Sequence, residues 1–329
     1  MRALCCVEPG RLELIEIAPP VPPKGWARVA IAHVGICGTD YHIFEGTHPF
    51  LAYPRVIGHE LSGRVVEPGD SGLAAGDPVV INPYLNCGHC EACLHGTPNC
   101  CDSLKVLVVH TEGGMTEEIV VPPGNLYRAD GLDLTDAAMV EFLAIGAHAV
   151  RRSQIEPGQR VLVIGGGPIG LGTAIFARIA GGDVTVLDAA DDKVDASRGF
   201  GFRAAGLSEV EGDAFKAARR TGFDVVLDAT GSLRSMAAAI NYVRNGGSLT
   251  LVGVTSGDLV WPDGEVHRRE LTIRSSRNAT DVDFRHVMDS IRNGSVPAKK
   301  LATHATDLDH VADRLPGWAK DRSGLIKAI

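Results

Sequence analysis

The chain has 329 residues, of which 45% are hydrophobic and 22% are charged, and its formal net charge is −8. This length predicts two domains of roughly 150 residues each. The acidic balance argues against a nucleic-acid partner, which would need a basic face. No apolar run approaches the roughly 20 residues of a membrane span.

The first residues lack a long apolar stretch, so we expect no signal peptide and a cytoplasmic protein. Clustered cysteines in such a protein more often bind metal or take part in chemistry than form disulfides. Five of the eight cysteines lie between Cys87 and Cys101, which favours metal binding.

Residues 1–148 are rich in glycine, proline, cysteine and histidine, with short β-like runs at 27–32 and 77–81. Such runs among frequent turn residues predict an irregular, β-rich domain. In the last stretch, 275–329, we expect a helix at 282–292. The apolar residues 325–329 are expected to return and complete the first domain.

Residues 149–274 instead predict alternating strands and helices. Residues 160–164 are almost wholly apolar, as expected of a strand in a parallel sheet covered on both faces. The remaining predicted elements are strands at 184–187, 223–228 and 248–252 and helices at 169–180 and 233–243. This repetition predicts an α/β domain with a doubly wound parallel sheet, the Rossmann arrangement.

A glycine-rich turn joins the first of these strands to its helix. Its sequence, Gly165-Gly166-Gly167-Pro168-Ile169-Gly170, matches the pattern G-x-G-x-x-G. The glycines allow a tight turn, approach of a pyrophosphate and close helix packing, while Pro168 and Ile169 begin a helix whose N-terminus faces the phosphates. Asp188 ends the second strand, where a carboxylate would bind the adenosine ribose and repel a 2′-phosphate. These residues predict NAD rather than NADP, although a structural turn with a surface aspartate is the alternative.

A second pattern is C-x2-C-x2-C-x7-C, formed by Cys87, Cys90, Cys93 and Cys101. Four thiolates can close a tetrahedron around Zn²⁺ and leave no open position, which predicts a structural zinc. Cys100 competes for the fourth place. A nucleic-acid zinc ribbon is the alternative, but it usually splits its ligands into two separated pairs.

A second metal site is predicted from Cys37 and His59, which are flanked by glycine, with Glu60 adjacent and Glu141 far along the chain. A cysteine, a histidine and a carboxylate with water in the fourth position form a catalytic zinc site. From spacing alone, a buried cysteine or a core histidine is the commoner role of either residue.

These motifs resemble the medium-chain zinc-dependent alcohol dehydrogenases, especially their polyol, threonine and sugar-acid branches. The resemblance rests on GICGTDYH (35–42), GHELSG (58–63), CGHCEAC (87–93) with Cys101, Glu141 before a helix, and GGGPIG (165–170). It implies a GroES-like catalytic domain, built from 1–148 and 275–329, around a Rossmann domain at 149–274. It also implies two zinc ions per chain, NAD as cofactor, and a homodimer or homotetramer.

The resemblance further assigns roles to single residues. Cys37, His59 and Glu60 correspond to catalytic zinc ligands, and Glu141 to a carboxylate that binds zinc directly or through water. Cys101, rather than Cys100, completes the structural site. Thr39 and His42 correspond to a proton relay, for which an imidazole is suited near neutral pH, although a surface imidazole is the alternative for His42.

Two departures from the family pattern stand out. Glu141-Phe142-Leu143 replaces the Glu-Pro-Leu that is common in the polyol branch, and Gly72 ends the signature that begins at Gly58, where a small aliphatic residue is usual. The first departure affects the surroundings of the third ligand, and we interpret the second as a shortened loop.

The reaction expected from this resemblance is hydride transfer between NAD and a hydroxyl-bearing small molecule, with zinc as a Lewis acid. Runs at 81–84 and 276–278 resemble bacterial sugar-acid dehydrogenases of the L-galactonate type, which favours a hexonate substrate. Arg277, followed by Asn278, is a candidate for binding a substrate carboxylate or the cofactor, or for a structural salt bridge. The alternatives are a threonine or 2,3-butanediol dehydrogenase and an inactive regulatory homologue, although every expected ligand position is filled.

Overall fold

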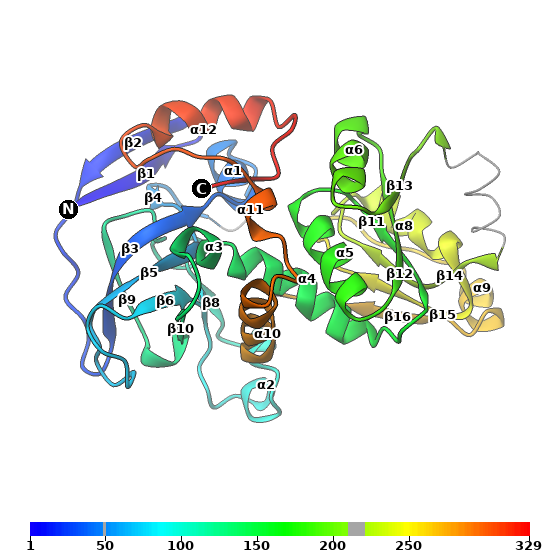
Figure 1. Cartoon of the computed structure of the whole chain (residues 1–329), viewed down its shortest axis with the longest axis horizontal. Helices are drawn as coiled ribbons and strands as arrows, with labels where there is room; N and C mark the ends of the chain where they lie inside the picture. Colours follow the sequence, from blue (N-terminus) through cyan, green and yellow to red (C-terminus); the bar gives the residue numbers. More distant parts are fainter. Residues whose placement is uncertain (49–50, 210–220) are drawn as a thin grey trace. The chain divides into compact units, whose positions relative to one another are not determined.

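The computed structural model describes residues 1–48, 51–209 and 221–329, which form two compact units (Figure 1). The first comprises Met1–Glu141 and Thr280–Ile329, and the second comprises Phe142–Ala279. The sequence placed the boundaries at 148/149 and 274/275. Most of helix α4 (Val140–Ser153) belongs to the second unit, because it packs closely against the helix that contains Thr173. A Cβ atom at Gly146 would lie only 2.6 Å from the backbone nitrogen of Thr173.

The first unit is built from small antiparallel sheets and short helices. Its main sheet has the order β10-β6-β5-β3-β9, and a second sheet has the order β2-β1-β4. The strands are β1 (Arg2–Glu8), β2 (Arg11–Glu16), β3 (Ala27–Gly35), β4 (Arg55–Val56), β5 (Glu60–Glu67), β6 (Pro78–Ile81), β7 (Tyr84–Leu85), β8 (Lys105–Val106), β9 (Glu118–Val121), β10 (Leu126–Arg128), β17 (Ala302–His304) and β18 (Lys327–Ala328). The helices are α1 (Gly38–Phe44), α2 (Glu91–Leu94), α3 (Leu134–Ala138), α10 (Asp281–Arg292), α11 (Ala298–Leu301) and α12 (Val311–Lys320).

The two ends of the described chain share one hydrophobic core in this unit. Leu4 of β1, Ile43 of α1, Leu315 of α12 and Leu325 are all buried in it, and α12 lies beside β1 and β2 (Figure 1). The backbone nitrogen of Ile36 also donates a 2.9 Å hydrogen bond to the carbonyl of Ala328 in β18. Residues 325–329 therefore lie against the segment that leads into Cys37.

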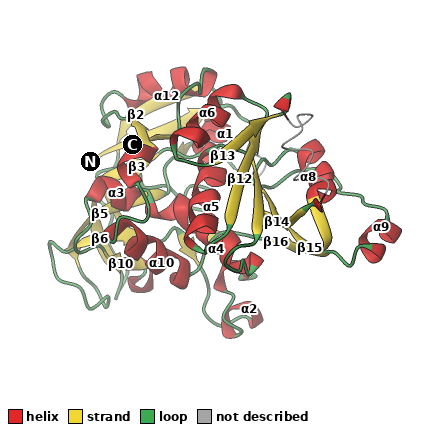
Figure 2. Cartoon of the chain, turned by 45° about the vertical axis from the view of Figure 1, so that its right-hand side comes forward, coloured by secondary structure: helices red, strands yellow, loops and turns green. Residues whose placement is uncertain are grey.

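The second unit contains the doubly wound parallel sheet that the sequence predicted (Figure 2). Its strand order is β13-β12-β11-β14-β15-β16, and all neighbouring strands are parallel. The elements are β11 (Arg160–Ile164), α5 (Pro168–Ile179), β12 (Asp183–Asp188), α6 (Asp191–Gly199), β13 (Arg203–Gly206), β14 (Phe223–Asp228), α8 (Leu233–Ala239), β15 (Val243–Leu251), α9 (Asp263–Arg268) and β16 (Thr272–Ser275). The order reverses between β11 and β14, and ligands of such sheets bind outside the carboxyl ends of the strands at that point.

Local chemistry explains where the elements differ from expectation. The helix predicted at 233–243 ends at Ala239 and continues only as a 3₁₀ turn, Ile240–Tyr242. Strand β15 begins at Val243, five residues earlier than expected, and its pairing with β14 shifts in register between Phe223 and Val225. The glycines at 246 and 247 interrupt the apolar pattern there and so conceal the start of the strand.

Within the described ranges, no helix is both long and apolar enough to cross a bilayer.

Candidate active site

Cys37, His59 and Glu60 come together in the first unit. One possible ligand atom from each lies within 4.8 Å of the others. Cys37 is the N-cap of α1, His59 precedes β5, and Glu60 is the first residue of β5. The structure thus brings together three of the four residues that the sequence proposed for a catalytic metal site.

Asp40 fixes the two segments that carry these residues. Its side chain is fully buried, and one carboxylate oxygen accepts a 2.9 Å hydrogen bond from the backbone nitrogen of Cys37, completing the capping box of α1. The other oxygen accepts a 2.9 Å hydrogen bond from the backbone nitrogen of Gly58. Burial raises the pKa of Asp40, although these donors and His59 oppose that shift. This role of Asp40 was not predicted from the sequence.

The chemistry of the donor set suits zinc. His59 is buried, and within the described part of the chain its Nδ1 has no hydrogen-bond partner. A buried polar atom without a partner is costly, and a metal ion is one of the few groups that satisfies an imidazole nitrogen. Thiolate, imidazole and carboxylate together form a known zinc-binding set.

Glu60 has a partner that was not predicted from the sequence. The Nζ of Lys327 in β18 lies 2.7 Å from both carboxylate oxygens of Glu60 and 3.2 Å from the carbonyl oxygen of Ile36. Both side chains of this ion pair are almost completely buried. Burial alone would lower the pKa of Lys327, but Glu60, Cys37 and Glu141 together outweigh burial and raise it.

Glu141 lies outside the group of three among the described residues. It lies in the first turn of α4, is buried, and its Oε1 accepts a hydrogen bond from the Tyr84 hydroxyl. Burial raises the pKa of Glu141, and burial followed by the Glu141 charge raises that of Tyr84. The Tyr84 ring packs edge-on against Phe284 at 6.2 Å, which holds the hydroxyl in place.

Thr39 and His42 lie on one face of α1, because they are three residues apart in the helix. The Oγ1 of Thr39 is 3.8 Å from the Sγ of Cys37. The side chain of His42 is 55% exposed, and its Nδ1 is 3.1 Å from the Oγ1 of Thr47 and 3.6 Å from the Oε2 of Glu45. Thr39 therefore lies at the metal group and His42 lies towards solvent.

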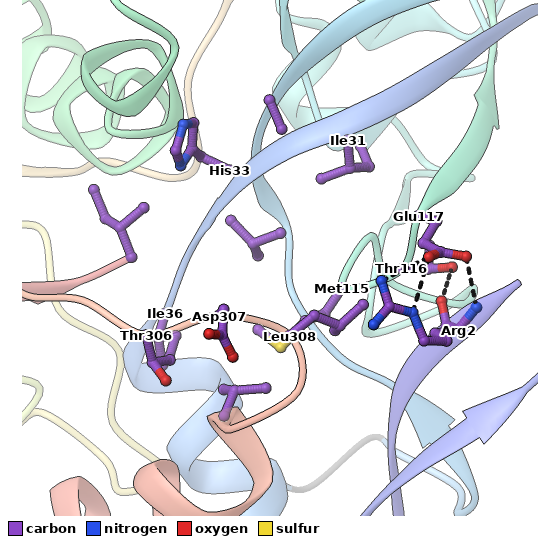
Figure 3. Close-up of a pocket in the computed structure, with 14 residues that line it drawn as sticks. Arg2, Ile31, His33, Ile36, Met115, Thr116, Glu117, Thr306, Asp307 and Leu308 are labelled. Atoms are coloured by element: carbon purple, nitrogen blue, oxygen red, sulfur yellow. Dashed lines mark hydrogen bonds and ion pairs between the residues drawn. The ribbon is translucent and has the colours of Figure 1, made fainter.

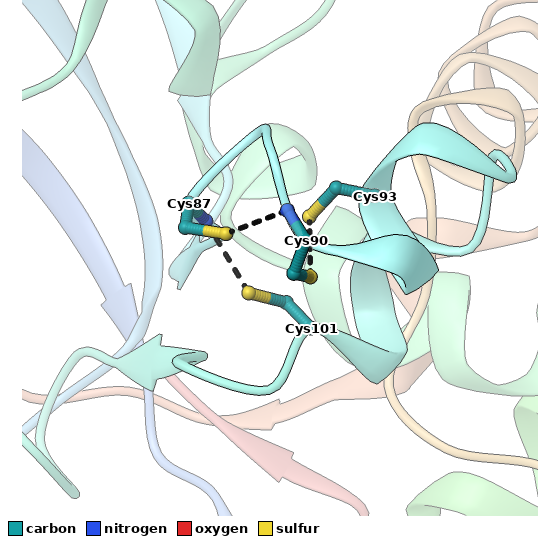
Figure 4. A group of neighbouring side chains, drawn as sticks. All are labelled: Cys87, Cys90, Cys93 and Cys101. Carbon is teal, nitrogen blue, oxygen red and sulfur yellow. Dashed lines mark hydrogen bonds between the residues drawn. The ribbon is translucent and has the colours of Figure 1, made fainter.

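The four cysteines of the predicted structural zinc site also come together (Figure 4). Their sulfur atoms, from Cys87, Cys90, Cys93 and Cys101, lie within 4.8 Å of one another. Hydrogen bonds from the backbone at His89 and Cys90 lower the pKa of Cys87 to about 6, which favours the thiolate needed for zinc. Cys100 is exposed and lies outside the group.

The glycine-rich turn in the second unit has the geometry of a phosphate-binding loop. Gly165 adopts a left-handed φ of +102°, and Gly167 is the N-cap of α5 with Pro168 at its first turn. A Cβ atom at Gly167 would meet nothing within 4 Å, so the backbone there is accessible. At Gly170 a Cβ atom would lie 1.7 Å from the carbonyl oxygen of Gly165, so the helix approaches the loop too closely for any other residue.

Asp188 lies beside this loop at the carboxyl end of β12. One carboxylate oxygen accepts a 2.5 Å hydrogen bond from the backbone nitrogen of Gly166, and the other accepts a 2.8 Å hydrogen bond from that of Ala190. These bonds fix the carboxylate next to the glycine-rich turn. Each oxygen retains a lone pair for a further donor, such as a ribose hydroxyl.

Arg277 is exposed in the loop that follows β16, as the sequence placed it. The following residue, Asn278, has a left-handed φ of +53°. Among the described residues, the Oγ of Ser276 and the Nδ2 of Asn278 are buried without a hydrogen-bond partner. Such atoms need an explanation, and a bound ligand with hydroxyl or amide groups would provide one.

A cavity of about 370 Å³ in the first unit contains none of these predicted residues. Figure 3 shows Arg2 and Glu117 at one side of it, joined by a 2.9 Å hydrogen bond. Arg2 also pairs with Asp309 at 2.6 Å. Because these charges are already paired, we assign the chemistry to the metal group and not to this cavity.

The Cys37–His59–Glu60 group, the four-cysteine group and the dinucleotide-binding fold together define a zinc- and nicotinamide-dependent oxidoreductase. Residues 23–131 match the alcohol dehydrogenase GroES-like domain, and residues 168–293 match the zinc-binding dehydrogenase family. The chain therefore belongs to the zinc-binding alcohol dehydrogenase family, as the sequence indicated, and the predicted fold is confirmed.

Two proteins and one solved structure illustrate the relationship. L-galactonate-5-dehydrogenase of Escherichia coli is 38% identical, with 100% of this chain and 98% of that protein covered. L-idonate 5-dehydrogenase of Vitis vinifera is 32% identical, with 84% of this chain and 80% of that protein covered. An Escherichia coli alcohol dehydrogenase (rspB) in complex with NADH superposes with a TM-score of 0.92 at 31% identity, with 100% of this chain and 98% of that chain covered.

These similarities establish the enzyme class. The protein is an oxidoreductase of the polyol and sugar-acid dehydrogenase group, and its cofactors are zinc and a nicotinamide dinucleotide.

Proposed function

We propose that the protein transfers a hydride between NAD and a secondary hydroxyl of a sugar acid, with an L-galactonate-like hexonate as the favoured substrate. The observation that carries the chemistry is the Cys37–His59–Glu60 group with its unpaired, buried imidazole nitrogen. The full-length similarity to an L-galactonate-5-dehydrogenase supports the choice of substrate.

In this proposal Cys37 and His59 hold the catalytic zinc together with a carboxylate from Glu60 or Glu141. Cys87, Cys90, Cys93 and Cys101 hold a second, structural zinc. When bound at the catalytic site, zinc supplies a Lewis acid that makes a substrate hydroxyl easier to deprotonate.

The proton would leave through α1. Thr39 lies close enough to Cys37 to accept a hydrogen bond from a hydroxyl at the metal group. His42 is exposed on the same helix face and can pass the proton to solvent. Tyr84 orients the carboxylate of Glu141 by its hydrogen bond.

The glycine-rich turn would bind the cofactor. The backbone at Gly165, Gly167, Pro168, Ile169 and Gly170 would cradle the pyrophosphate at the N-terminus of α5. Asp188 would accept hydrogen bonds from the adenosine ribose and repel a 2′-phosphate, which favours NAD.

Arg277 is proposed to bind the substrate carboxylate or the cofactor. It is exposed, and its guanidinium can form two parallel hydrogen bonds to a carboxylate. The unpaired polar atoms of Ser276 and Asn278 support a ligand at this loop. We also propose that the enzyme acts in the cytoplasm as a homodimer or homotetramer, which light scattering on the purified protein would test.

The test is NADH formation by zinc-replete protein with L-galactonate, L-gulonate, sorbitol, xylitol, L-threonine and 2,3-butanediol, each with NAD and with NADP. We expect a hexonate with NAD to react fastest and Cys37→Ala to lose turnover while NADH still binds. Preference for a neutral polyol, a diol or threonine would contradict the proposed substrate but not the chemistry. An active Cys37→Ala protein, or only one zinc per chain, would contradict the catalytic metal site.

A further inference from the structure

The ion pair between Glu60 and Lys327 is the least expected feature of the metal group. A lysine is almost never fully buried unless it is paired. Lys327 is buried, and its Nζ contacts three oxygen atoms: both carboxylate oxygens of Glu60 at 2.7 Å and the Ile36 carbonyl at 3.2 Å. An ammonium group has three protons to donate, so these three contacts use its full capacity.

The backbone is shaped to accommodate this pair. Gly35 of β3 pairs with Glu60 of β5, and a Cβ atom at Gly35 would lie 2.2 Å from the Oε2 of Glu60. Because Gly35 has no side chain, the carboxylate of Glu60 can occupy the space beside it. Lys327 approaches from β18, where Ala328 is hydrogen-bonded to Ile36, the residue before Cys37. One lysine therefore contacts both of the segments that carry the three residues of the metal group.

Charge balance shows why a cation is needed there. When ionised, Cys37, Glu60 and Glu141 carry three negative charges within a buried region, and a zinc ion brings only two positive charges. Lys327 supplies the third. Buried charges are expensive unless they are paired, and the loss of one partner leaves the other uncompensated.

We propose that Lys327 is a positioning residue that orients Glu60 and supplies the fixed positive charge that balances the thiolate of Cys37 and the buried carboxylates of Glu60 and Glu141 around a single zinc ion. This inference rests on the zinc site of the proposed function. Lys327 contacts neither substrate nor cofactor in this proposal; it acts through Glu60.

The experiment compares Lys327→Met, which keeps much of the volume but removes the charge, with Lys327→Arg, which keeps the charge. Lys320→Met is the matched control, because Lys320 is an exposed lysine at the end of α12 in the same unit. Each protein is prepared with zinc and, separately, with cobalt at the catalytic site. Turnover and metal content are measured on the zinc form, and the visible absorption of the cobalt form reports the ligand geometry.

We expect Lys327→Met to change the cobalt spectrum and to lower kcat by about tenfold or more, as for other residues that support metal ligands. Lys327→Arg should retain most of the wild-type spectrum and turnover, and Lys320→Met should retain both fully. A role of Lys327 in filling space alone would leave the spectrum of a folded Lys327→Met protein unchanged.

A double variant keeps the proposal testable if Lys327→Met does not fold. Lys327→Met combined with Glu60→Gln removes both charges of the pair and leaves no buried charge unpaired. Because Lys327 acts through Glu60, adding Lys327→Met to Glu60→Gln should leave the cobalt spectrum of the Glu60→Gln protein unchanged and its kcat within about twofold. This non-additivity is expected only of residues that act as a pair.

Two results would overturn the inference. One is a folded Lys327→Met protein with the wild-type cobalt spectrum and kcat within about twofold, and the other is additive effects of Lys327→Met and Glu60→Gln. Wild-type protein that retains only the metal of the four-cysteine site would instead refute the proposed catalytic zinc, and this inference with it. The metal content of the wild type therefore separates the two failures.

Discussion

An alanine at Gly170 tests whether the close approach of α5 to the glycine-rich turn shapes the dinucleotide site. A Cβ atom there would lie 1.7 Å from the Gly165 carbonyl oxygen, whereas Cβ contacts below 3.0 Å essentially never occur. The turn would have to move by at least 3.0 − 1.7 = 1.3 Å. No side chain can rotate to relieve this contact, because the atom it meets is backbone. Overpacking of this kind costs about 1–3 kcal/mol.

Gly172, two residues along the same helix, provides the matched control. A Cβ atom there would meet Leu143 at 3.5 Å, an ordinary contact, and alanine is favoured over glycine in a helix by roughly 0.5–1 kcal/mol. We expect Gly170→Ala to raise the NADH dissociation constant by about 30-fold, which corresponds to roughly 2 kcal/mol, and Gly172→Ala to bind normally and unfold at slightly higher urea. NADH fluorescence titration and urea unfolding provide both measurements. Wild-type NADH affinity in Gly170→Ala would refute this account of the turn.

Three further changes address other parts of the molecule. Cys93→Ser should remove one of the two expected zinc ions and lower the unfolding midpoint, and a full complement of zinc by elemental analysis would argue against the four-thiolate site. Tyr84→Phe keeps the ring against Phe284 but removes the hydrogen bond to Glu141; we expect kcat to fall about tenfold, with NADH affinity as the unchanged control. Burial would raise the pKa of Asp224, but Arg244 and Arg160 outweigh burial and lower it below 3.8. The interaction of Asp224 with these two arginines therefore stabilises the fold above about pH 3.8, the ordinary pKa of an aspartate. This contribution is lost as the pH falls through the lower pKa that Asp224 has in the folded state. Asp224→Asn should lower the urea midpoint at pH 7 much more than at pH 3, and equal losses at both pH values would contradict the assignment.

The sequence predicted the elements whose pattern is continuous and local. The strand expected at 223–228 is β14, Phe223–Asp228, and the strand at 160–164 is β11, because the short apolar runs at 225–227 and 161–164 mark strands buried on both faces. The four cysteines were also found by spacing, since the ligands lie within 15 residues of one another.

Contacts between distant residues could not be predicted in this way. Lys327 and Glu60 are 267 residues apart, and Tyr84 and Glu141 are 57 apart, so no spacing pattern links either pair. A lysine is also ordinarily expected at the surface, so the residue type gives no indication that Lys327 is buried. The C-x-x-Asp run from Cys37 to Asp40 was the only local signal for the missed capping aspartate, because it matches a capping box.

The division of the catalytic unit between two distant segments has a consequence for synthesis of the chain. Phe142–Ala279 is continuous, so it can fold as soon as it leaves the ribosome, whereas Met1–Glu141 must wait for Thr280–Ile329. At roughly 5–20 residues per second, translation from residue 142 to residue 329 takes about 10–40 s. During that interval Leu4 and Ile43 lack the partners that later cover them, Leu315 and Leu325. We therefore expect the nascent catalytic unit to be more exposed to aggregation during synthesis than the continuous second unit.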